Sequence, residues 1–513
     1  MIIKKNNSFL AKIELVGNKL PDISMLFLYA LIFIWGLSFV LSFVNFNYFH
    51  PTTKEQIIII NMLAPQELLL LLTNMVKNYA LFPPLAMTVI VTIGVGIAEG
   101  SGFLTTAVKK GMRITSQKWI TPTVAFVSIL SNLISDSAYV ILMPLASLIF
   151  YLAGKHPLAG IAASFAALAG GFSASYIPSP MDPIMQGFTQ SAVNLLDKSY
   201  IINVLCNYFF SVTSTFAVIG VVWFITDKII EPKLFATMPI ELSKEDQIEL
   251  ESHNIISDLE TKAFKITIIV IGILAILLFF ALFPENSIFR AVDGSLTSSK
   301  APIMQSIVPI IFLFFAIPGL VFGSIMGIFK TSKDVSKSMV KTIMTLSGFF
   351  VFSFFCSQFL YVFGKSNIGT LIAISGAELL KSLNMPPQIT IVGLISLTSV
   401  LNLIITSASS KWAILAPIFV PMLMGVNIAP ELTQAAFRLS DAAVNVSTPM
   451  FAFYPLIISY CQKYCKQTGV GTLCSMMIPY TIGLLIVLTS MLFLFWGLGI
   501  PLGIDSNYIY MPK

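Results

Sequence analysis

Three ionisable residues stand in stretches of sequence that are otherwise apolar, where a charge is costly and therefore suggests a function. Asp182 lies in SPMDPIM between two prolines, which break helices and free backbone carbonyls, so its carboxylate could carry a proton or hold a cation. The alternative for Asp182 is a position at the edge of a loop. Arg438 keeps its charge at all relevant pH values, and its planar guanidinium matches the carboxylate of an anionic substrate. Asp441 follows Arg438 by three residues, so the two could instead form a structural ion pair on one helix face.

Short polar side chains gather in two clusters, at 131–139 and at 402–412, each in the middle of a long apolar run. Their oxygen atoms could coordinate Na⁺ or hydrogen-bond a substrate, or the two clusters could simply pack against each other. Trp412 ends the second cluster and could stack on an aromatic ring, although packing is the common role of a buried tryptophan. The candidate residues for ion coupling in these clusters are Asn132, Ser135 and Asp136 in the first and Asn402, Thr406 and Ser407 in the second.

Sequence signals for enzymatic chemistry are absent. The chain has three scattered histidines, no HExxH and no GxxxxGK[ST], so we expect no enzyme activity, no cofactor, no metal centre and no direct use of ATP. Cys461 and Cys465 have no nearby partners that would complete a zinc set, and we interpret them as ordinary thiols. The candidate sites therefore indicate binding of a solute or an ion and not covalent catalysis.

The composition places these sites inside a membrane. Of 513 residues, 56% are hydrophobic and 11% charged, and the mean hydropathy is +0.87. Soluble domains carry about 25% charged residues, and a helix needs about 20 apolar residues to cross the hydrocarbon core. We predict an all-α polytopic membrane protein with nine transmembrane helices. The predicted spans are 23–44, 81–99, 157–176, 200–226, 263–283, 302–329, 338–363, 433–458 and 475–499.

The two runs that contain the polar clusters, 118–153 and 388–427, are too short for two full spans and a turn. We expect each to form a re-entrant hairpin whose polar tip lies at membrane depth, where polar backbone is tolerated only if it is buried or lines a wet cavity. Most of the 30 Lys and Arg residues fall in loops of one side, which places the N-terminus in the cytoplasm. The net charge of +6 therefore reflects membrane topology and not a nucleic-acid partner.

This topology opens the two hairpins toward opposite sides of the membrane, as in an inverted repeat. Short echoes in matching order support a repeat: Asn132-Leu133-Ile134 against Asn402-Leu403-Ile404, and Ser179-Pro180-Met181 against Thr448-Pro449-Met450. We therefore divide the chain into a first half (1–226), a charged cytoplasmic linker (227–262) and a second half (263–513).

The segment GKHPLAGIAASFAALAGGFSASYIPSPMDPIMQGFTQSAV (154–193) resembles the AbgT family of p-aminobenzoyl-glutamate transporters. The second half agrees in NLIITSASSKWAILAPIFVPMLM and APELTQAAFRLSD, and the likeness extends over nearly the whole chain. The resemblance implies nine transmembrane helices, two opposed hairpins and a homodimer. It also implies a substrate path at matching positions, which are Asp182, Asn402, Trp412, Pro430 and Arg438, with Asp441 in the same motif.

We therefore expect an ion-coupled secondary transporter, driven by H⁺ or Na⁺, in a bacterial inner membrane. The resemblance implies p-aminobenzoyl-glutamate or a related anionic aromatic folate catabolite as substrate, and export of sulfonamide antimetabolites as a further role. The alternative is a sodium-coupled dicarboxylate carrier, which shares opposed hairpins. A Ser-Asn-Thr tip would favour that alternative, whereas here Ser131-Asn132 is followed by Leu133.

Overall fold

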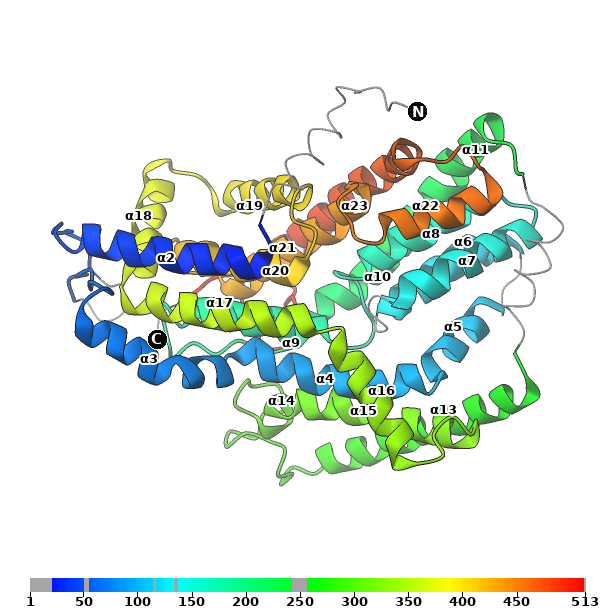
Figure 1. Cartoon of the computed structure of the whole chain (residues 1–513), viewed down its shortest axis with the longest axis horizontal. Helices are drawn as coiled ribbons and strands as arrows, with labels where there is room; N and C mark the ends of the chain where they lie inside the picture. Colours follow the sequence, from blue (N-terminus) through cyan, green and yellow to red (C-terminus); the bar gives the residue numbers. More distant parts are fainter. Residues whose placement is uncertain (1–20, 50–54, 114–116, 133–136, 242–255, 512–513) are drawn as a thin grey trace.

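The structure is a computed structural model, and it describes residues 21–49, 55–113, 117–132, 137–241 and 256–511. Within these ranges the regular structure is helical, apart from two isolated β-bridges, Phe49 with Gln56 and Ile428 with Ile509. Most of the long helices run roughly along the longest axis of the molecule (Figure 1). Ser135 and Asp136, two predicted tip residues, lie outside the described residues.

Among the described residues, seven helical segments are long and apolar enough to cross a membrane. A helix of 19 residues is about 28 Å long, close to the thickness of about 30 Å of the hydrocarbon core. Many apolar side chains on these helices are exposed, among them Phe33, Ile269 and Phe280. Their exposure is expected for a surface covered by lipid, and the chain is a multi-pass membrane protein. The segments are Ile23–Leu41 (α2), Pro65–Gly100 (α3 Pro65–Ala80 and α4 Pro83–Gly100), Tyr208–Thr237, Asp258–Leu282 (α13), Ile307–Ile325 (α15), Ser347–Lys365 (α17) and Val470–Leu498 (α23).

Two predicted spans, 157–176 and 433–458, do not form long helices. In the first, α8 (Pro157–Gly170) ends at a pair of glycines, and in the second, α21 (Pro430–Val444) ends before the η4 turn (Asn445–Ser447). Both helices are too short to cross a bilayer, and every one of their residues is buried. The chain resumes in α9 (Met181–Val193) and α22 (Tyr454–Tyr464).

The matched Ser179-Pro180-Met181 and Thr448-Pro449-Met450 echoes fall at these two interruptions. Proline lacks an N–H and disfavours helical backbone in the preceding residue, so these prolines keep the segments after the two central helices out of helical conformation. The other spans occur with shifted limits. The remaining elements are α5 (Phe103–Arg113), α10 (Tyr208–Ile225), α14 (Pro302–Gln305), α16 (Ser332–Met344) and α18 (Ile368–Ser382).

Each predicted hairpin is a pair of short helices. The first consists of α6 (Ile120–Ser131), which follows the short η1 turn (Gln117–Trp119), and α7 (Ser137–Leu152), and both helices pack on α8. The second consists of α19 (Pro387–Asn402) and α20 (Ala408–Met424), and both helices pack on α21. In Figure 1, α6 and α7 lie toward the right end of the long axis, whereas α19 and α20 lie nearer its middle.

The two halves exchange a helix. Helix α9 of the first half packs on α20 of the second hairpin, whereas α22 of the second half packs on α7 and α8. The buried helices α8 and α21 also contact each other. Side chains from both halves therefore meet around α21.

The predicted linker is partly ordered helix and not wholly a solvated chain. A π-helical turn, η3 (Thr226–Ile230), and α11 (Glu231–Thr237) continue α10. Lys155, at the base of the first hairpin, binds Asp227 at 2.8 Å and Glu231 at 3.1 Å. These two ion pairs fix the start of the predicted linker to the base of the first hairpin.

Candidate functional site

The centre of the site is a row of polar side chains on α21, a helix that is otherwise surrounded by apolar packing. Glu431, Gln434, Arg438, Asp441 and Asn445 follow one another at intervals of three or four residues, which places them on one helix face. The first four are buried. Polar groups in such surroundings need partners, and each of the four has one from a different part of the chain.

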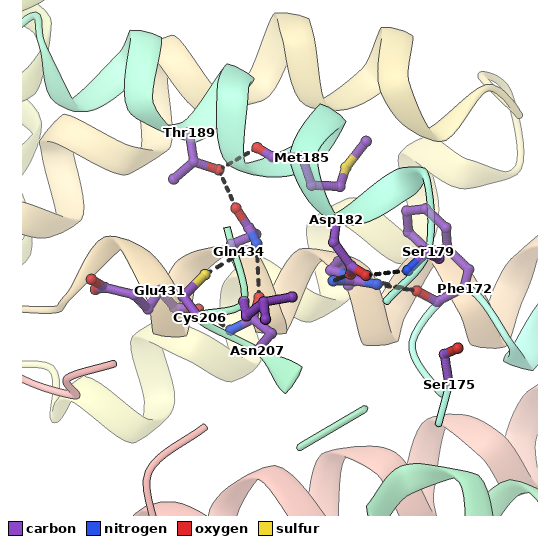
Figure 2. A network of polar contacts seen from close by, with 12 residues as sticks. Phe172, Ser175, Ser179, Asp182, Met185, Thr189, Cys206, Asn207, Glu431 and Gln434 are labelled. Atoms are coloured by element: carbon purple, nitrogen blue, oxygen red, sulfur yellow. Dashed lines mark hydrogen bonds and ion pairs between the residues drawn. The ribbon is translucent and has the colours of Figure 1, made fainter. Parts of the chain in front are cut away.

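Arg438 pairs with Asp182 of α9, with 2.7 Å between Nη1 and Oδ1. Nε and Nη2 of Arg438 both donate to the backbone carbonyl of Phe172, and the guanidinium carbon lies 5.5 Å from the centre of the Phe172 ring. Asp182 also accepts a hydrogen bond from the backbone N–H of Ser179 at 2.6 Å (Figure 2). The pair thus ties the broken segment after α8 to the central helix of the other half.

The ion pair of Arg438 with Asp441, which the sequence left open as an alternative, does not form in the structure. Although three residues separate them on α21, Arg438 reaches α9 and Asp441 reaches α20. An i,i+3 pair stabilises a helix by only about 0.2–0.5 kcal/mol, whereas a buried charge without a close partner costs several kcal/mol. Partners from other segments give each charge an opposite charge and at least one further hydrogen bond, which a pair on one helix would not provide.

Asp441 pairs with Lys411, the residue before Trp412, and both side chains are almost fully buried. The Lys411 ammonium also donates to the side-chain carbonyl of Asn402, whose amide donates to the backbone carbonyl of Asp441 at 3.1 Å. Asn402 ends the first arm of the second hairpin and Lys411 lies near the start of the other arm. The three residues therefore clamp the tip of this hairpin to α21.

Trp412 has no accessible face in this conformation, which differs from its predicted role as a platform for a substrate ring. Its side chain is 0% exposed and stacks on Phe437 at a centroid distance of 4.5 Å. Its indole N–H donates to Thr189 Oγ1 at 2.8 Å. Thr189 donates to Gln434 Oε1 at 2.6 Å, and Gln434 donates to Asn207 Oδ1 at 2.9 Å (Figure 2).

At the far end of the row, Tyr200 donates its hydroxyl hydrogen to the carboxylate of Glu431, with distances of 2.9 and 3.2 Å to the two oxygens. Asn207 donates to the backbone carbonyl of Glu431 at 3.0 Å. Pro430 is the first residue of α21, where proline is well suited because its missing N–H would have no helical partner. In this conformation Pro430 starts the helix α21.

Among the described tip residues, the side chain of Asn402 contacts a charged pair, whereas those of Asn132 and Ser407 have other neighbours. Asn132 lies against Gly171 at the end of α8, since a side chain at Gly171 would come within 3.2 Å of its Nδ2. Ser407 caps α20 through its hydroxyl, which accepts from the backbone N–H of Ser410, and Thr406 is half-buried beside it. The structure therefore brings together Asp182 with Arg438, and Asn402 with Asp441, but adds Lys411 between the latter two.

Sequence reasoning missed Lys411 as an ion-pair partner, and it missed the polar residues Thr189, Tyr200, Glu431 and Gln434. The regular spacing of polar residues in PELTQAAFRLSDAAVN was the available signal. A polar stripe with helical period inside an apolar segment predicts a buried polar face.

A cavity of about 950 Å³ lies near the C-terminal end of α9. Three lysines from separate elements line it, Lys77, Lys198 and Lys365, and all three are exposed. The carboxylate in its lining, Asp197, is occupied by hydrogen bonds from Ser199 and Tyr510. Positive charge that lines a concave surface raises the local concentration of anions.

Comparisons with known proteins give this geometry its context. Residues 8–510 match the AbgT putative transporter family. The chain belongs to this family. It is 30% identical to the p-aminobenzoyl-glutamate transport protein of Escherichia coli over 495 residues, which cover 96% of this chain and 95% of that protein.

Two solved structures share the fold. The YdaH transporter of Alcanivorax borkumensis matches with a TM-score of 0.88 and 35% identity, over 94% of this chain and all of that chain. MtrF of Neisseria gonorrhoeae, described with a class of antimetabolite efflux pumps, matches with a TM-score of 0.91 and 35% identity, over 98% and 100%. The predicted family is confirmed, and so is the prediction of a transporter and not an enzyme.

Proposed function

We propose that this protein is an ion-coupled secondary transporter of p-aminobenzoyl-glutamate or a related anionic aromatic compound. It acts as a homodimer in a bacterial inner membrane, with its N-terminus in the cytoplasm. The observation that carries this proposal is the buried pair of Arg438 and Asp182, which joins the interrupted segments of the two halves. The substrate is suggested by the Escherichia coli relative, whose name specifies p-aminobenzoyl-glutamate transport.

In the proposed mechanism, a substrate carboxylate replaces Asp182 as the partner of Arg438. A guanidinium can hold a carboxylate through two parallel charge-assisted hydrogen bonds. Breaking the buried pair without replacement is costly, so the site opens readily only when substrate or a proton compensates the charges. Asp182 then accepts a proton or moves to solvent, while Arg438 holds the substrate.

The lysine-lined cavity supports an anionic substrate. p-Aminobenzoyl-glutamate carries two carboxylates, and Lys77, Lys198 and Lys365 would concentrate it beside α9, the helix that carries Asp182. Alternating access would proceed by movement of the hairpins and central helices of the halves 1–226 and 263–513. The matched breaks after α8 and α21 and the opposed hairpins support an inverted repeat.

The test is uptake of radiolabelled p-aminobenzoyl-glutamate into proteoliposomes under an imposed pH or Na⁺ gradient. We expect accumulation by the wild type and none by R438A. The matched control is R290A, because Arg290 is a half-buried loop residue whose guanidinium bonds only backbone carbonyls among its described contacts, at the end of α13 and in the loop after it. Normal uptake by R438A would remove Arg438 from the substrate site.

An efflux direction rests on the likeness to MtrF and is tested separately. Cells that express the protein should tolerate more sulfonamide than cells that express R438A. Strong competition of uptake by succinate or citrate, with no effect of p-aminobenzoyl-glutamate, would favour the dicarboxylate carrier instead.

A further inference from the structure

Lys411 has no role in the proposed substrate path, yet it is 1% exposed within the second hairpin. Lysine is almost never fully buried unless its charge is paired, because its ammonium is strongly hydrated in water. Ordinary packing at this position would be served by an apolar residue. The presence of a buried lysine at a hairpin tip therefore calls for a function.

The surroundings of Lys411 are those of a site for a monovalent cation. Its ammonium contacts the carboxylate of Asp441 and the side-chain carbonyl of Asn402. The two oxygen atoms come from the end of α19, the first arm of the second hairpin, and from α21, while Lys411 itself lies on the other arm, α20. Transporters hold a coupling ion between broken helices in a similar way. In this protein, the positive charge between these oxygen atoms is the ammonium group of Lys411.

We propose that Lys411 is the coupling site of this transporter, and that the coupling ion is a proton carried on Nζ and not Na⁺. This inference rests on the proposed function and names its driving ion. In the loaded state, the ammonium neutralises Asp441 and holds Asn402. When the site opens to water, an N–H bond of Lys411 breaks, the proton passes to water, and the neutral amine keeps the electron pair.

The unloaded state leaves the Asp441 carboxylate buried without a counter-charge. Burial of an unpaired charge is strongly unfavourable, so the empty site resists the movement that would carry it across the membrane. Uptake of a proton from water on either side restores the pair. This difference between the two states couples movement of the site to the proton.

The other ionisable groups to consider lie on α21 itself and on the helices that pack on α20 and α21. Helix α9 carries Asp182 and α21 carries Arg438, which pair with each other, while Glu431 of α21 is bonded to Tyr200. Helix α18, which packs on α20, contributes Glu378 and Lys381, and α23, which packs on α21, contributes Cys474 and Tyr480. The described parts of α8 and α19 contain no charged residue.

The first test needs no variant. Proteoliposomes are loaded so that a pH gradient or a Na⁺ gradient is imposed in turn, with uptake of p-aminobenzoyl-glutamate and internal pH followed together. We expect accumulation under the pH gradient, movement of protons with substrate, and no effect when Na⁺ is replaced by choline. Accumulation driven by Na⁺ alone would overturn the inference but leave the transporter proposal intact.

The second test separates a proton carrier from a structural charge. K411R keeps the positive charge and the ion pair, but an arginine cannot release its proton. We expect K411R to lose accumulation driven by pH, whereas K381R, which changes an exposed lysine of α18, keeps it. Full accumulation by K411R would overturn the inference.

Because arginine is larger than lysine, the double variant K411M/D441N provides an independent test. It removes both charges and leaves similar volume in the buried site. We expect substrate flux in this variant to show no response to the pH gradient. A response to the pH gradient equal to that of the wild type would contradict the proposal.

A final measurement uses no substrate. It therefore tests the coupling site even if p-aminobenzoyl-glutamate is not the substrate. Thermal unfolding of the purified protein is compared in Na⁺ and in choline at equal ionic strength. We expect no stabilisation specific to Na⁺ in the wild type, since the ammonium fills the cation position. Specific stabilisation by Na⁺ would overturn the inference even if no transport of the probe were seen.

Discussion

Arg438 and Asp182 lie 256 residues apart in the sequence, and their side chains meet at 2.7 Å inside the protein. One belongs to the central helix of the second half and the other begins the helix that follows the break in the first half. Both are largely buried, with side chains 4% and 11% exposed. This contact joins the two halves at the candidate site, and its energetics lead to the first prediction.

Removing one partner of the pair should destabilise the protein more than removing both. D182A leaves the guanidinium buried without its carboxylate, which typically costs about 3–5 kcal/mol, whereas exchanging both for apolar residues is often neutral. We expect D182A and R438M each to lower the unfolding temperature strongly, and D182A/R438M to lower it less than their sum. Strictly additive losses in thermal unfolding would show that the two residues do not interact energetically.

Trp412 should act through packing and its indole hydrogen bond, not through contact with substrate. W412F keeps an aromatic ring on Phe437 but loses the bond to Thr189, which should cost about 1 kcal/mol. W412A empties a buried site and should cost about 3–5 kcal/mol. We expect W412F to leave the KM for p-aminobenzoyl-glutamate unchanged in proteoliposomes. A large rise in KM at normal stability would restore Trp412 to the substrate site.

The lysine-lined cavity should set how uptake depends on salt. K77Q/K365Q removes two positive charges from its rim, so we expect a higher apparent KM and a weaker dependence of the uptake rate on ionic strength. The control is K330Q, because Lys330 is exposed and lies outside the cavity. Equal salt dependence of the wild type and the double variant would contradict a role of the cavity in attracting substrate.

His156 should make the protein less stable in acid. Burial lowers the pKa of His156, and the opposing effects of the Met238 carbonyl and of Glu231 do not outweigh it. The unfolded chain therefore binds a proton more readily than the folded one, so stability falls as the pH drops below about 6.5, the ordinary pKa of histidine. Protonation would also remove Nδ1 as acceptor for the N–H of Leu158.

The check is thermal unfolding of the wild type and H156N between pH 5 and pH 8, a range that spans the ordinary histidine pKa. Asparagine caps helix N-termini well, so this variant keeps the cap of α8 and loses the titration. We expect a smaller loss of stability in acid for H156N. The same loss in both proteins would assign the effect to other groups.

Much of the architecture follows from local properties of the sequence. Apolar runs predicted the long helices, and runs too short for two spans predicted the paired helices α6/α7 and α19/α20. The spans 157–176 and 433–458 were predicted too long, because apolar composition alone does not reveal that Gly170-Gly171 and Pro449 end the helices. Hydropathy averages over such breaks, whereas backbone geometry depends on single residues.

By itself, the sequence determined the membrane class, the family and four residues of the two buried ion-pair clusters, Asp182, Asn402, Arg438 and Asp441, since composition and motif are properties of nearby positions. Only the tertiary structure decided which charges pair: Arg438 with Asp182, and Asp441 with Lys411. Spacing along one helix had left the pair of Arg438 with Asp441 open as an alternative. In a buried site, α9 of the first half brings Asp182 to Arg438 and α20 of the second half brings Lys411 to Asp441. The cost of leaving any charge unpaired selects that arrangement.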